Sequence, residues 1–391
     1  DLHSFPTRRS SDLRLSARLL SVVRRNRRLY MRVLMAMSGG VDSSVAAMLL
    51  LEKGYELVGV TFRTFDSIKE SCIAREKGCC SVESIMDAKH LAERLGFEHH
   101  ILDYRDIFRE SVIKNFAEEY LRGRTPNPCV LCNSHIKWGE LFRAADAYGC
   151  DKIATGHYAR ISERAGYYYL REAVDVKKDQ TYFLWMLTND NLRRTLFPLG
   201  CLTKEEVRSE ASRHGFERLS KKTESQEICF VADNDYRNFL RRELGEESLV
   251  AFRAGDFIDV SGKVLGRHSG YANYTIGQRK GLGIAIGKQC FVKRIDPLRN
   301  EVVLSDRDDL FSRRVLLSGV RLRDAAWLRE DSRIEVKIRY RSSKVSGSIT
   351  GIGEDGSCEL LLESDVWGVT PGQSAVLYKD GLVVGGGIIE G

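Results

Sequence analysis

Residues 33–51 read VLMAMSGGVDSSVAAMLLL: an apolar run, a short polar turn and a second apolar run. The first run, residues 33–37, has the length and residue types of a buried strand. The second run continues to Leu51, and Gly54 is a typical residue just beyond a helix C-terminus. The pattern therefore predicts a buried strand, a tight turn and a buried helix.

Strands and helices alternate through the first half of the chain. Short apolar runs predict strands at residues 55–63, 97–102 and 152–155, and helical periodicity is found at 85–95, 107–121 and 136–148. Such alternation is typical of a parallel sheet with helices on both faces, which binds ligands at the carboxyl ends of its strands. We expect a Rossmann-like α/β domain.

The pattern changes after residue 232. A short helix at 235–244 is followed by brief β-runs separated by glycines, which predict a small β-rich central domain. From about residue 291 alternating strands dominate and predict an antiparallel β-barrel of about six strands. We expect domains at residues 31–232, 233–290 and 291–391.

Residues 1–30 differ from the rest in charge. They hold eight arginines and two aspartates, so they supply +6 of the net charge of +7. An Arg-rich, acid-poor leader can be an organellar transit peptide. This one also resembles a translated fragment fused ahead of a natural start at Met31, which is the interpretation that we favour. We expect residues 1–30 to be non-native or disordered, and the charge of the remainder indicates no particular partner.

The turn at residues 38–44 has the features of a phosphate site. Adjacent glycines let a ligand approach the backbone, and the N–H groups at a helix start favour an anion. The hydroxyls of Ser38, Ser43 and Ser44 add donors, and Asp42 stands in the first turn of the predicted helix. No Gly-Lys-Ser/Thr follows, so the turn is not a Walker-type loop. The alternative is an ordinary turn of small residues.

The chain has ten cysteines, which without a secretory signal favour thiol chemistry over structural bridges. Cys72, Cys79 and Cys80 lie in a polar stretch that lacks paired zinc-ligand spacing, and no metal site is predicted. Cys129 and Cys132 lie in RTPNPCVLCN, a stiff loop because of its two prolines. This CxxC could be a redox pair, half of a zinc site or a coincidence. Cys229, between Ile228 and Phe230, has the surroundings of a buried core thiol.

Three further segments hold candidate residues. At residues 156–158 a glycine at a strand end would admit a nucleotide, and His157 is either catalytic or a satisfied structural histidine. Residues 178–180 form a polar turn before an apolar run. In residues 333–341, apolar side chains alternate with a row of mainly cationic ones, which could follow a phosphate backbone or simply face solvent.

The string SGGVDSS resembles the pyrophosphate loop (PP-loop) of ATP pyrophosphatases. Together with TPNPCVLCN, ATGHY, KKDQTYFLW, the ICF cysteine, YTIGQRKGLGI and VTPGQSAVLY, it resembles the tRNA-specific 2-thiouridylase family (MnmA) from Met31 to the C-terminus. This resemblance implies a sulfurtransferase that adenylates the wobble uridine (position 34) of tRNAs for Lys, Glu and Gln and replaces its 2-oxygen by sulfur. It also implies a PP-loop domain, a small central domain and a C-terminal barrel.

The same resemblance implies roles for individual residues. The expected ATP-binding residues are Ala36, Met37, Ser38, Gly39, Gly40, Val41, Asp42, Ser43, Phe62 and Gly156. Asp42, within reach of a phosphate-bound magnesium ion, is also expected to be catalytic together with Cys132 and Cys229. The expected contacts with the target base are Asn127, Pro128 and Cys129, the last where some relatives carry Asp, and those with tRNA are Lys178, Asp179, Gln180, Arg339 and Tyr340. Cys132 matches a nucleophile that closes a disulfide with Cys229, which matches the persulfide carrier.

The implied co-substrate and cofactor are ATP and Mg²⁺, and the implied partners are tRNA and a protein that delivers a persulfide. No apolar span is long enough to cross a membrane, so we expect a soluble, cytoplasmic protein. Three other functions remain open: another PP-loop enzyme such as a lysidine or amidating synthetase, a non-catalytic RNA-binding protein, and a thiol redox sensor.

Overall fold

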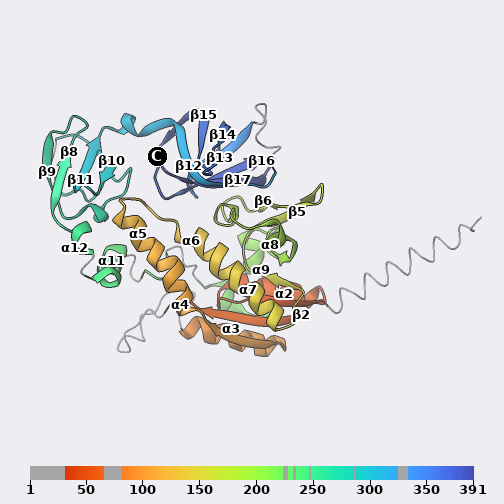
Figure 1. Ribbon diagram of the computed structural model, residues 1–391. Coiled ribbons are helices and arrows are strands. Elements are labelled where there is room, and N and C mark those ends of the chain that lie inside the picture. Colours follow the sequence, from red (N-terminus) through yellow and green to blue (C-terminus); the bar gives the residue numbers. More distant parts are fainter. Residues whose placement is uncertain are drawn as a thin grey trace, which may run out of the picture.

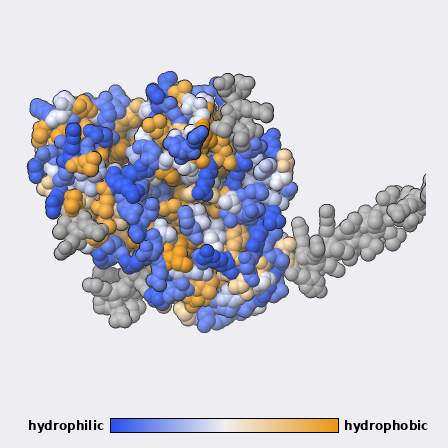
Figure 2. Space-filling model, viewed as in Figure 1, coloured by the Kyte–Doolittle hydropathy of each residue, from blue (hydrophilic) through white to orange (hydrophobic). Residues whose placement is uncertain are grey.

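The computed structural model describes residues 31–65, 82–222, 228–231, 235–245, 248–285, 287–324 and 333–391. The expectations for residues 1–30 and for Cys72, Cys79 and Cys80 lie outside these ranges. In the described part, no helix combines the length and the apolar character that a membrane crossing requires. On the face shown in Figure 2, hydrophobic residues appear in scattered groups between hydrophilic ones.

The first domain is built on a five-stranded sheet in the order β3-β2-β1-β4-β7, with every neighbouring pair parallel. Its strands are β1 (Arg32–Ala36), β2 (Glu56–Arg63), β3 (Glu98–Asp103), β4 (Lys152–Ala154) and β7 (Thr195–Leu196). The prediction of a parallel α/β domain is confirmed.

Helices cover both faces of this sheet (Figure 1). Val33 and Met35 of β1 belong to a hydrophobic cluster that also contains residues of α2 (Val41–Glu52), α3 (Val82–Leu95) and α9 (Lys204–Arg213). Leu34 points the other way, into a cluster with residues of α7 (Trp138–Ala147). Because successive side chains of a strand face opposite sides, β1 is buried on both.

Two long helical segments carry π-helical turns. The first runs through α4 (Arg105–Phe108), η2 (Arg109–Ile113) and α5 (Lys114–Leu121), and the second through α6 (Pro128–Leu131), η3 (Cys132–Lys137) and α7. The second segment corrects a prediction, since Cys129 and Cys132 lie in a helix rather than in a loop. Pro128 is its first residue, where a missing N–H and a fixed φ are tolerated.

The remaining helical elements are short. They are η4 (Thr181–Phe183), α8 (Asn189–Arg193), α10 (Glu217–Ser220), α11 (Tyr236–Leu244), α12 (Ser248–Ala251), η7 (Tyr271–Asn273) and η8 (Arg307–Leu310).

The central sheet has four strands in the order β10-β11-β8-β9. They are β8 (Gly255–Ile258), β9 (Val264–His268), β10 (Phe291–Asp296) and β11 (Glu301–Ser305). The strands predicted at 291–305 do not belong to the C-terminal barrel, so that part of the prediction is wrong. Val302 of β11 pairs with Phe257 of β8 in a parallel register, so both strands complete the central sheet.

The C-terminal strands form a closed antiparallel barrel, because β12 pairs with both β15 and β17. The six strands are β12 (Phe311–Leu322), β13 (Ile334–Lys337), β14 (Val345–Ile352), β15 (Cys358–Trp367), β16 (Ser374–Lys379) and β17 (Leu382–Ile389). The barrel prediction is confirmed, but the strand expected at 333–341 ends at Lys337.

The barrel is joined to the first domain by a hairpin and a buried aromatic contact. The hairpin consists of β5 (Arg160–Arg164) and β6 (Tyr167–Arg171), and β6 pairs with β17. Trp185 is buried, donates a hydrogen bond of 3.1 Å from Nε1 to Ser374 Oγ, and packs against Gly386, where an added Cβ would lie 2.6 Å from its ring. The two domains therefore share part of their core.

Replacing Trp185 by alanine should destabilise this junction by about 3–5 kcal/mol, because it leaves a large cavity and an unpaired Ser374 hydroxyl. The midpoint of urea unfolding, followed by circular dichroism, measures the effect. Leu298→Ala is the matched control, since Leu298 is 99% exposed. Equal midpoints for the two variants would contradict a shared core.

Candidate nucleotide and thiol site

The predicted phosphate-binding turn between β1 and α2 has a backbone that only glycine adopts easily. Gly39 has a φ of +67°, and an added Cβ would lie 2.0 Å from the carbonyl oxygen of Ser84 on α3. Gly40 is the N-cap of α2, and no side chain caps this helix. The N–H groups at the helix start are thus not satisfied by a capping side chain, which suits an anion.

The serine hydroxyls hold the turn together. Ser43 Oγ donates to Gly40 O over 3.2 Å and accepts from the Ser38 N–H over 3.1 Å, while Ser44 Oγ donates to Gly40 O over 2.8 Å. Ser43 and Ser44 are buried, whereas Ser38 is exposed. Of the three serines expected to donate to phosphate, only Ser38 presents its side chain to solvent.

Asp42 takes part in a polar network that the sequence analysis missed. Its Oδ1 accepts 2.6 Å from Lys204 Nζ and 2.7 Å from the Tyr158 hydroxyl. Lys204 is 7% exposed and lies in the first turn of α9, which a capping box of Thr203 and Glu206 fixes. The carboxylate is therefore held at the loop by a nearly buried ammonium group.

Gly156 and His157 lie at the end of β4, beside the same helix start. An added Cβ at Gly156 would lie 2.7 Å from the Ser43 N, so this glycine lets β4 approach α2 closely. His157 Nδ1 lies 2.7 Å from Thr155 Oγ1, and Nε2 lies 3.5 Å from Lys137 Nζ. Burial, with a smaller contribution from Lys137, lowers the pKa of His157 well below its usual value. These contacts match the structural interpretation of His157.

Cys132 and the chain around Cys229 meet at one hydrophobic cluster. Phe230 is buried in it against Phe108 and Phe116, with ring centroids 5.6 and 5.2 Å away, and Cys132 and Ile228 pack at its edge. Cys229 itself is exposed, which corrects the expectation of a core thiol. Both thiols are outside any disulfide. Phe62, expected near the nucleotide, packs against the same cluster.

Cys129 differs from Cys132 in its surroundings. Part of the residue is exposed, but protein atoms packed around its thiol raise its pKa, an effect that Lys137 opposes. A raised thiol pKa disfavours the thiolate, which is the nucleophilic form.

The segment before these cysteines, residues 125–127, is hydrogen-bonded to the barrel. Gln373 Nε2 donates to the carbonyl oxygens of Thr125 and Pro126 over 3.0 and 3.1 Å, and the Thr125 N–H donates to Pro371 O over 2.9 Å. Asn127 is the N-cap of α6, and Pro128 is buried. The helix that carries both cysteines therefore begins at the domain junction.

The residues expected to touch tRNA have unequal access to solvent. Asp179 is 4% exposed, and its two carboxylate oxygens accept from the Ala173 N–H and the Thr181 hydroxyl. Gln180 exchanges hydrogen bonds with the Tyr158 backbone, and Lys178 is half-buried. Burial raises the pKa of Asp179. Asp179 thus supports the turn from inside, and its predicted contact with tRNA stays a prediction.

Arg339 and Tyr340 lie just after β13 and not on an open strand face. Arg339 Nη2 donates to Gly368 O and, over 2.6 Å, to Thr370 Oγ1. The Tyr340 ring lies 4.4 Å from that of Phe183, between the barrel and the first domain. The expected row of cations is therefore interrupted, because the Arg339 guanidinium group binds the barrel.

Comparison with known protein families supports this architecture. Residues 31–233 match the model described as "tRNA methyl transferase HUP domain", residues 237–306 the "tRNA methyl transferase PRC-barrel domain" and residues 318–389 the "Aminomethyltransferase beta-barrel domain". The chain is 46% identical to "tRNA-specific 2-thiouridylase MnmA" of Carboxydothermus hydrogenoformans, over 92% of this chain and 97% of the relative. The protein of the same name from Clostridioides difficile is 43% identical, over 92% and 98%.

The chain belongs to the tRNA-specific 2-thiouridylase family. Among solved structures, this 2-thiouridylase-family chain is similar to a 4-thiouridine synthetase in complex with RNA and ATP, at a TM-score of 0.35 and 16% identity over 56% of this chain and 52% of the other. The U34-tRNA thiolase NcsA from Methanococcus maripaludis gives 0.33 and 19%, over 56% and 67%. These TM-scores are too low to carry a conclusion.

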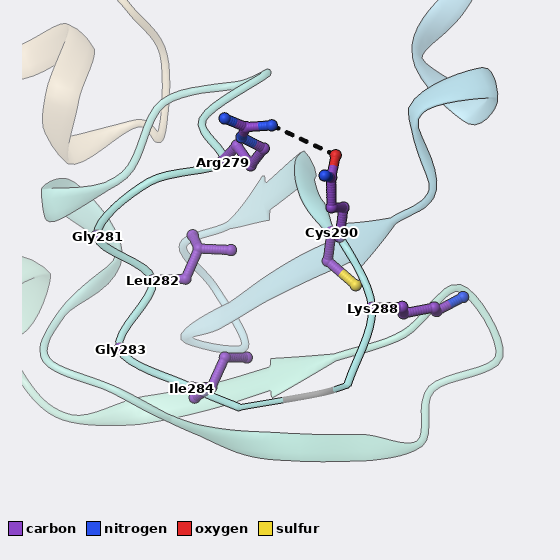
Figure 3. Close-up of a pocket in the computed structure, with 8 residues that line it drawn as sticks. Arg279, Gly281, Leu282, Gly283, Ile284, Lys288 and Cys290 are labelled. Atoms are coloured by element: carbon purple, nitrogen blue, oxygen red, sulfur yellow. Dashed lines mark hydrogen bonds between the residues drawn. The ribbon is translucent and has the colours of Figure 1, made fainter.

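A separate pocket lies in the central domain. It has a volume of about 230 Å³ and is lined by Arg279, Gly281, Leu282, Gly283, Ile284, Lys288, Gln289 and Cys290. In Figure 3 the guanidinium group of Arg279 and the ammonium group of Lys288 lie on different sides of it. Arg279 donates a hydrogen bond to Gln289 over 3.3 Å, and Lys288 donates one to Asp306 over 3.0 Å. None of the residues predicted for the nucleotide or the thiols takes part.

Within the described ranges, no three His, Cys, Asp or Glu side chains form a group that could hold a metal ion. Sequence reasoning also missed Tyr158, Lys204, Lys222 and Gln373, all of which contact the predicted site residues or their loops. Local periodicity and spacing do not predict these contacts, because each one joins segments more than 100 residues apart.

Replacing Gly39 by alanine should abolish nucleotide binding and lower stability. The new Cβ would clash with the α3 backbone. The left-handed backbone conformation would cost an alanine about 1–2 kcal/mol more. Isothermal titration with ATP and thermal unfolding measure the two effects. Gly166→Ala is the matched control: Gly166 has a φ of +81°, but an added Cβ there has no atom within 4 Å. If both variants bind ATP like the wild type, the contact with Ser84 does not shape the loop.

Proposed function

We propose that this chain uses ATP and a persulfide to replace the 2-oxygen of uridine 34 by sulfur in tRNAs for Lys, Glu and Gln. The observation that carries the proposal is the joint packing of Cys132 and the residues flanking Cys229 in one cluster, which also contacts Phe62 at the end of β2. The strand ends and the phosphate loop therefore lie on the same side as the two thiols. Likeness to full-length 2-thiouridylases supports the same activity.

The first step requires a better leaving group than a uracil oxygen. In the proposed step the 2-oxygen of uridine attacks the α-phosphorus of ATP, the bond to the β-phosphate oxygen breaks, and pyrophosphate departs. The uncapped start of α2 donates N–H groups to the phosphates. Ala36, Met37 and Val41 contact the nucleotide through their backbone groups. Phe62 and Gly156 lie close to adenine and ribose. Such preorganised donors stabilise negative charge as it moves onto the leaving group.

Asp42 is the residue that would hold Mg²⁺. Its side chain is about 30% exposed, and its Oδ1 already accepts two hydrogen bonds, so the carboxylate is fixed at the helix start. When bound, the ion would neutralise phosphate charge. Lys204 and Tyr158 keep the carboxylate in place.

The second step transfers sulfur. A donor protein supplies a persulfide on Cys229, and its exposed position permits that delivery. The terminal sulfur bonds to C2 of the adenylated uridine and AMP leaves, while the Cys132 thiolate attacks Cys229 Sγ and breaks the persulfide bond. The products are 2-thiouridine and a Cys132–Cys229 disulfide, which an external reductant opens.

The target base is proposed to enter beside α6, framed by Asn127, Pro128 and Cys129. An anticodon base is already unpaired, so its movement into a pocket costs little. Lys178, Gln180, Arg339 and Tyr340 lie around the junction of the first domain and the barrel, which supports an RNA-binding role for this junction. Asp179 would act indirectly, because its buried carboxylate holds the turn that carries Lys178 and Gln180.

The domain limits are also a proposal. We place the catalytic domain at residues 31–232 and the central domain from 233, and we move the barrel's start from 291 to about 311. The pairing of β11 with β8 and the start of β12 at Phe311 support the change.

The direct test is mass analysis of nucleosides from unmodified tRNA incubated with the protein, ATP, Mg²⁺ and a persulfide donor. We expect 2-thiouridine at position 34 and pyrophosphate release that depends on tRNA. The family models are named for methyl transfer, and a methyl group gives a different mass increment from an oxygen-to-sulfur exchange. A methylated base, or pyrophosphate release without any thiolated base, would contradict the proposal.

A Cys132–Cys229 pair and a Cys129–Cys132 pair give opposite expectations for the activity of cysteine variants. Cys132→Ser and Cys229→Ser should each abolish 2-thiouridine formation from the persulfide donor, because each removes a sulfur atom of the exchange. Cys129→Ser is the matched control and should retain most of the turnover, since its thiol is disfavoured as a nucleophile.

Peptide mapping after a single turnover without reductant identifies the disulfide. We expect Cys132 joined to Cys229. A Cys129–Cys132 bond together with an active Cys229→Ser variant would refute the mechanism.

A further inference from the structure

A second lysine contacts the predicted phosphate-binding turn. Lys222 Nζ donates to Gly39 O over 3.0 Å and to Asp87 Oδ2 over 2.8 Å. Asp87 belongs to α3, the helix against which Gly39 packs. The Lys222 side chain is 32% exposed, so its ammonium group stands beside the loop and is accessible from solvent.

The bonding of Lys222 leaves capacity for a ligand. An ammonium group has three N–H donors, and Gly39 and Asp87 use two of them in the described part of the chain. One N–H therefore remains for a ligand oxygen at the loop. A phosphate oxygen is charged, so it accepts from an ammonium group more strongly than a carbonyl oxygen does.

The two lysines stand at the two ends of the turn. Lys222 binds Gly39 before the N-cap, and Lys204 binds Asp42 after it. Between them lie Gly40 and the first residue of α2, at a helix start without a side-chain cap. The positive end of the helix dipole and two ammonium groups thus all lie at this turn, and Asp42 and Asp87 pair with the lysines.

A purely structural role explains Lys222 less well. Its ion pair with Asp87 is partly exposed on both sides, at 32% and 39%, and such pairs contribute little to stability. Lys204, by contrast, is nearly buried and acts on Asp42 as a positioning residue.

We propose that Lys222 is a ligand of the phosphate chain of ATP and stabilises the pyrophosphate that leaves. The inference rests on the proposed use of ATP and deepens it. When the bond between the α-phosphorus and the bridging oxygen breaks, the electron pair stays on pyrophosphate. Lys222 donates a hydrogen bond to that charge and transfers no proton.

The test measures binding by isothermal titration, with inorganic pyrophosphate, ATP and adenosine as separate probes at a fixed Mg²⁺ concentration. Lys222→Met should weaken pyrophosphate and ATP roughly tenfold, the size expected for one charge-assisted hydrogen bond. Adenosine, which has no phosphate, should bind unchanged. Lys221→Met is the matched control, because Lys221 is the adjacent, exposed lysine and should bind all three probes like the wild type.

Asp87→Asn separates a ligand role from a structural one. If Lys222 binds phosphate, removing the competing carboxylate should leave pyrophosphate affinity equal or higher, the opposite sign to Lys222→Met. Equal losses in the two variants would show that only the ion pair matters and would overturn the inference, as would unchanged affinity in Lys222→Met or no pyrophosphate binding by the wild type.

These outcomes are independent of thiolation. Selective loss of pyrophosphate binding in Lys222→Met would uphold the inference even if the wild type formed no 2-thiouridine. In that case the proposed function alone would fail.

Discussion

The contact between Gly39 and the backbone of α3 is the constraint on which the site depends. No side chain fits between the turn and Ser84, so β1, α2 and α3 meet with only a glycine separating them. Gly156 likewise lets the segment after β4 approach the start of α2 closely. The N–H groups of that helix start are therefore held between two backbone segments, and their direction does not rely on mobile side chains. Asp42 and Lys222 are then placed relative to this rigid turn.

The sequence predicted those parts of the molecule that local periodicity determines. The strand, turn and helix at residues 33–51, the parallel α/β domain and the closed barrel all follow from patterns within short windows. The strands at 291–305 were misassigned because alternation shows that a strand exists but not which strand it pairs with, and β11 pairs with β8 more than 40 residues earlier. Pro128 was read as a loop signal, although a proline also suits the first turn of a helix.

The sequence points to the cysteines and glycines of the candidate site but not to the polar groups that contact them. SGGVDSS and the paired cysteines are unusual strings, and they carry a family resemblance. Lys204 lies in the first turn of a polar helix, and Lys222 lies in a polar stretch after α10. Lysines in such segments usually face solvent, so only the folded chain shows that they reach the loop. Asp179 shows the converse: in a polar turn it appears exposed, but the Ala173 N–H and the Thr181 hydroxyl hold its carboxylate inside.

The placement of Cys229 has a consequence for the lifetime of the protein under oxidative conditions. Phe230 anchors the chain in a cluster of aromatic rings, so the neighbouring thiol keeps its position while remaining exposed. Access for a protein donor is also access for peroxide, and a thiol on the surface can be oxidised beyond the stages that a reductant reverses. Cys132, packed at the edge of the cluster, is partly shielded from the same attack. Damage by oxidants should therefore begin at Cys229, the proposed sulfur carrier, and an oxidised population would keep its fold while losing the proposed ability to accept sulfur.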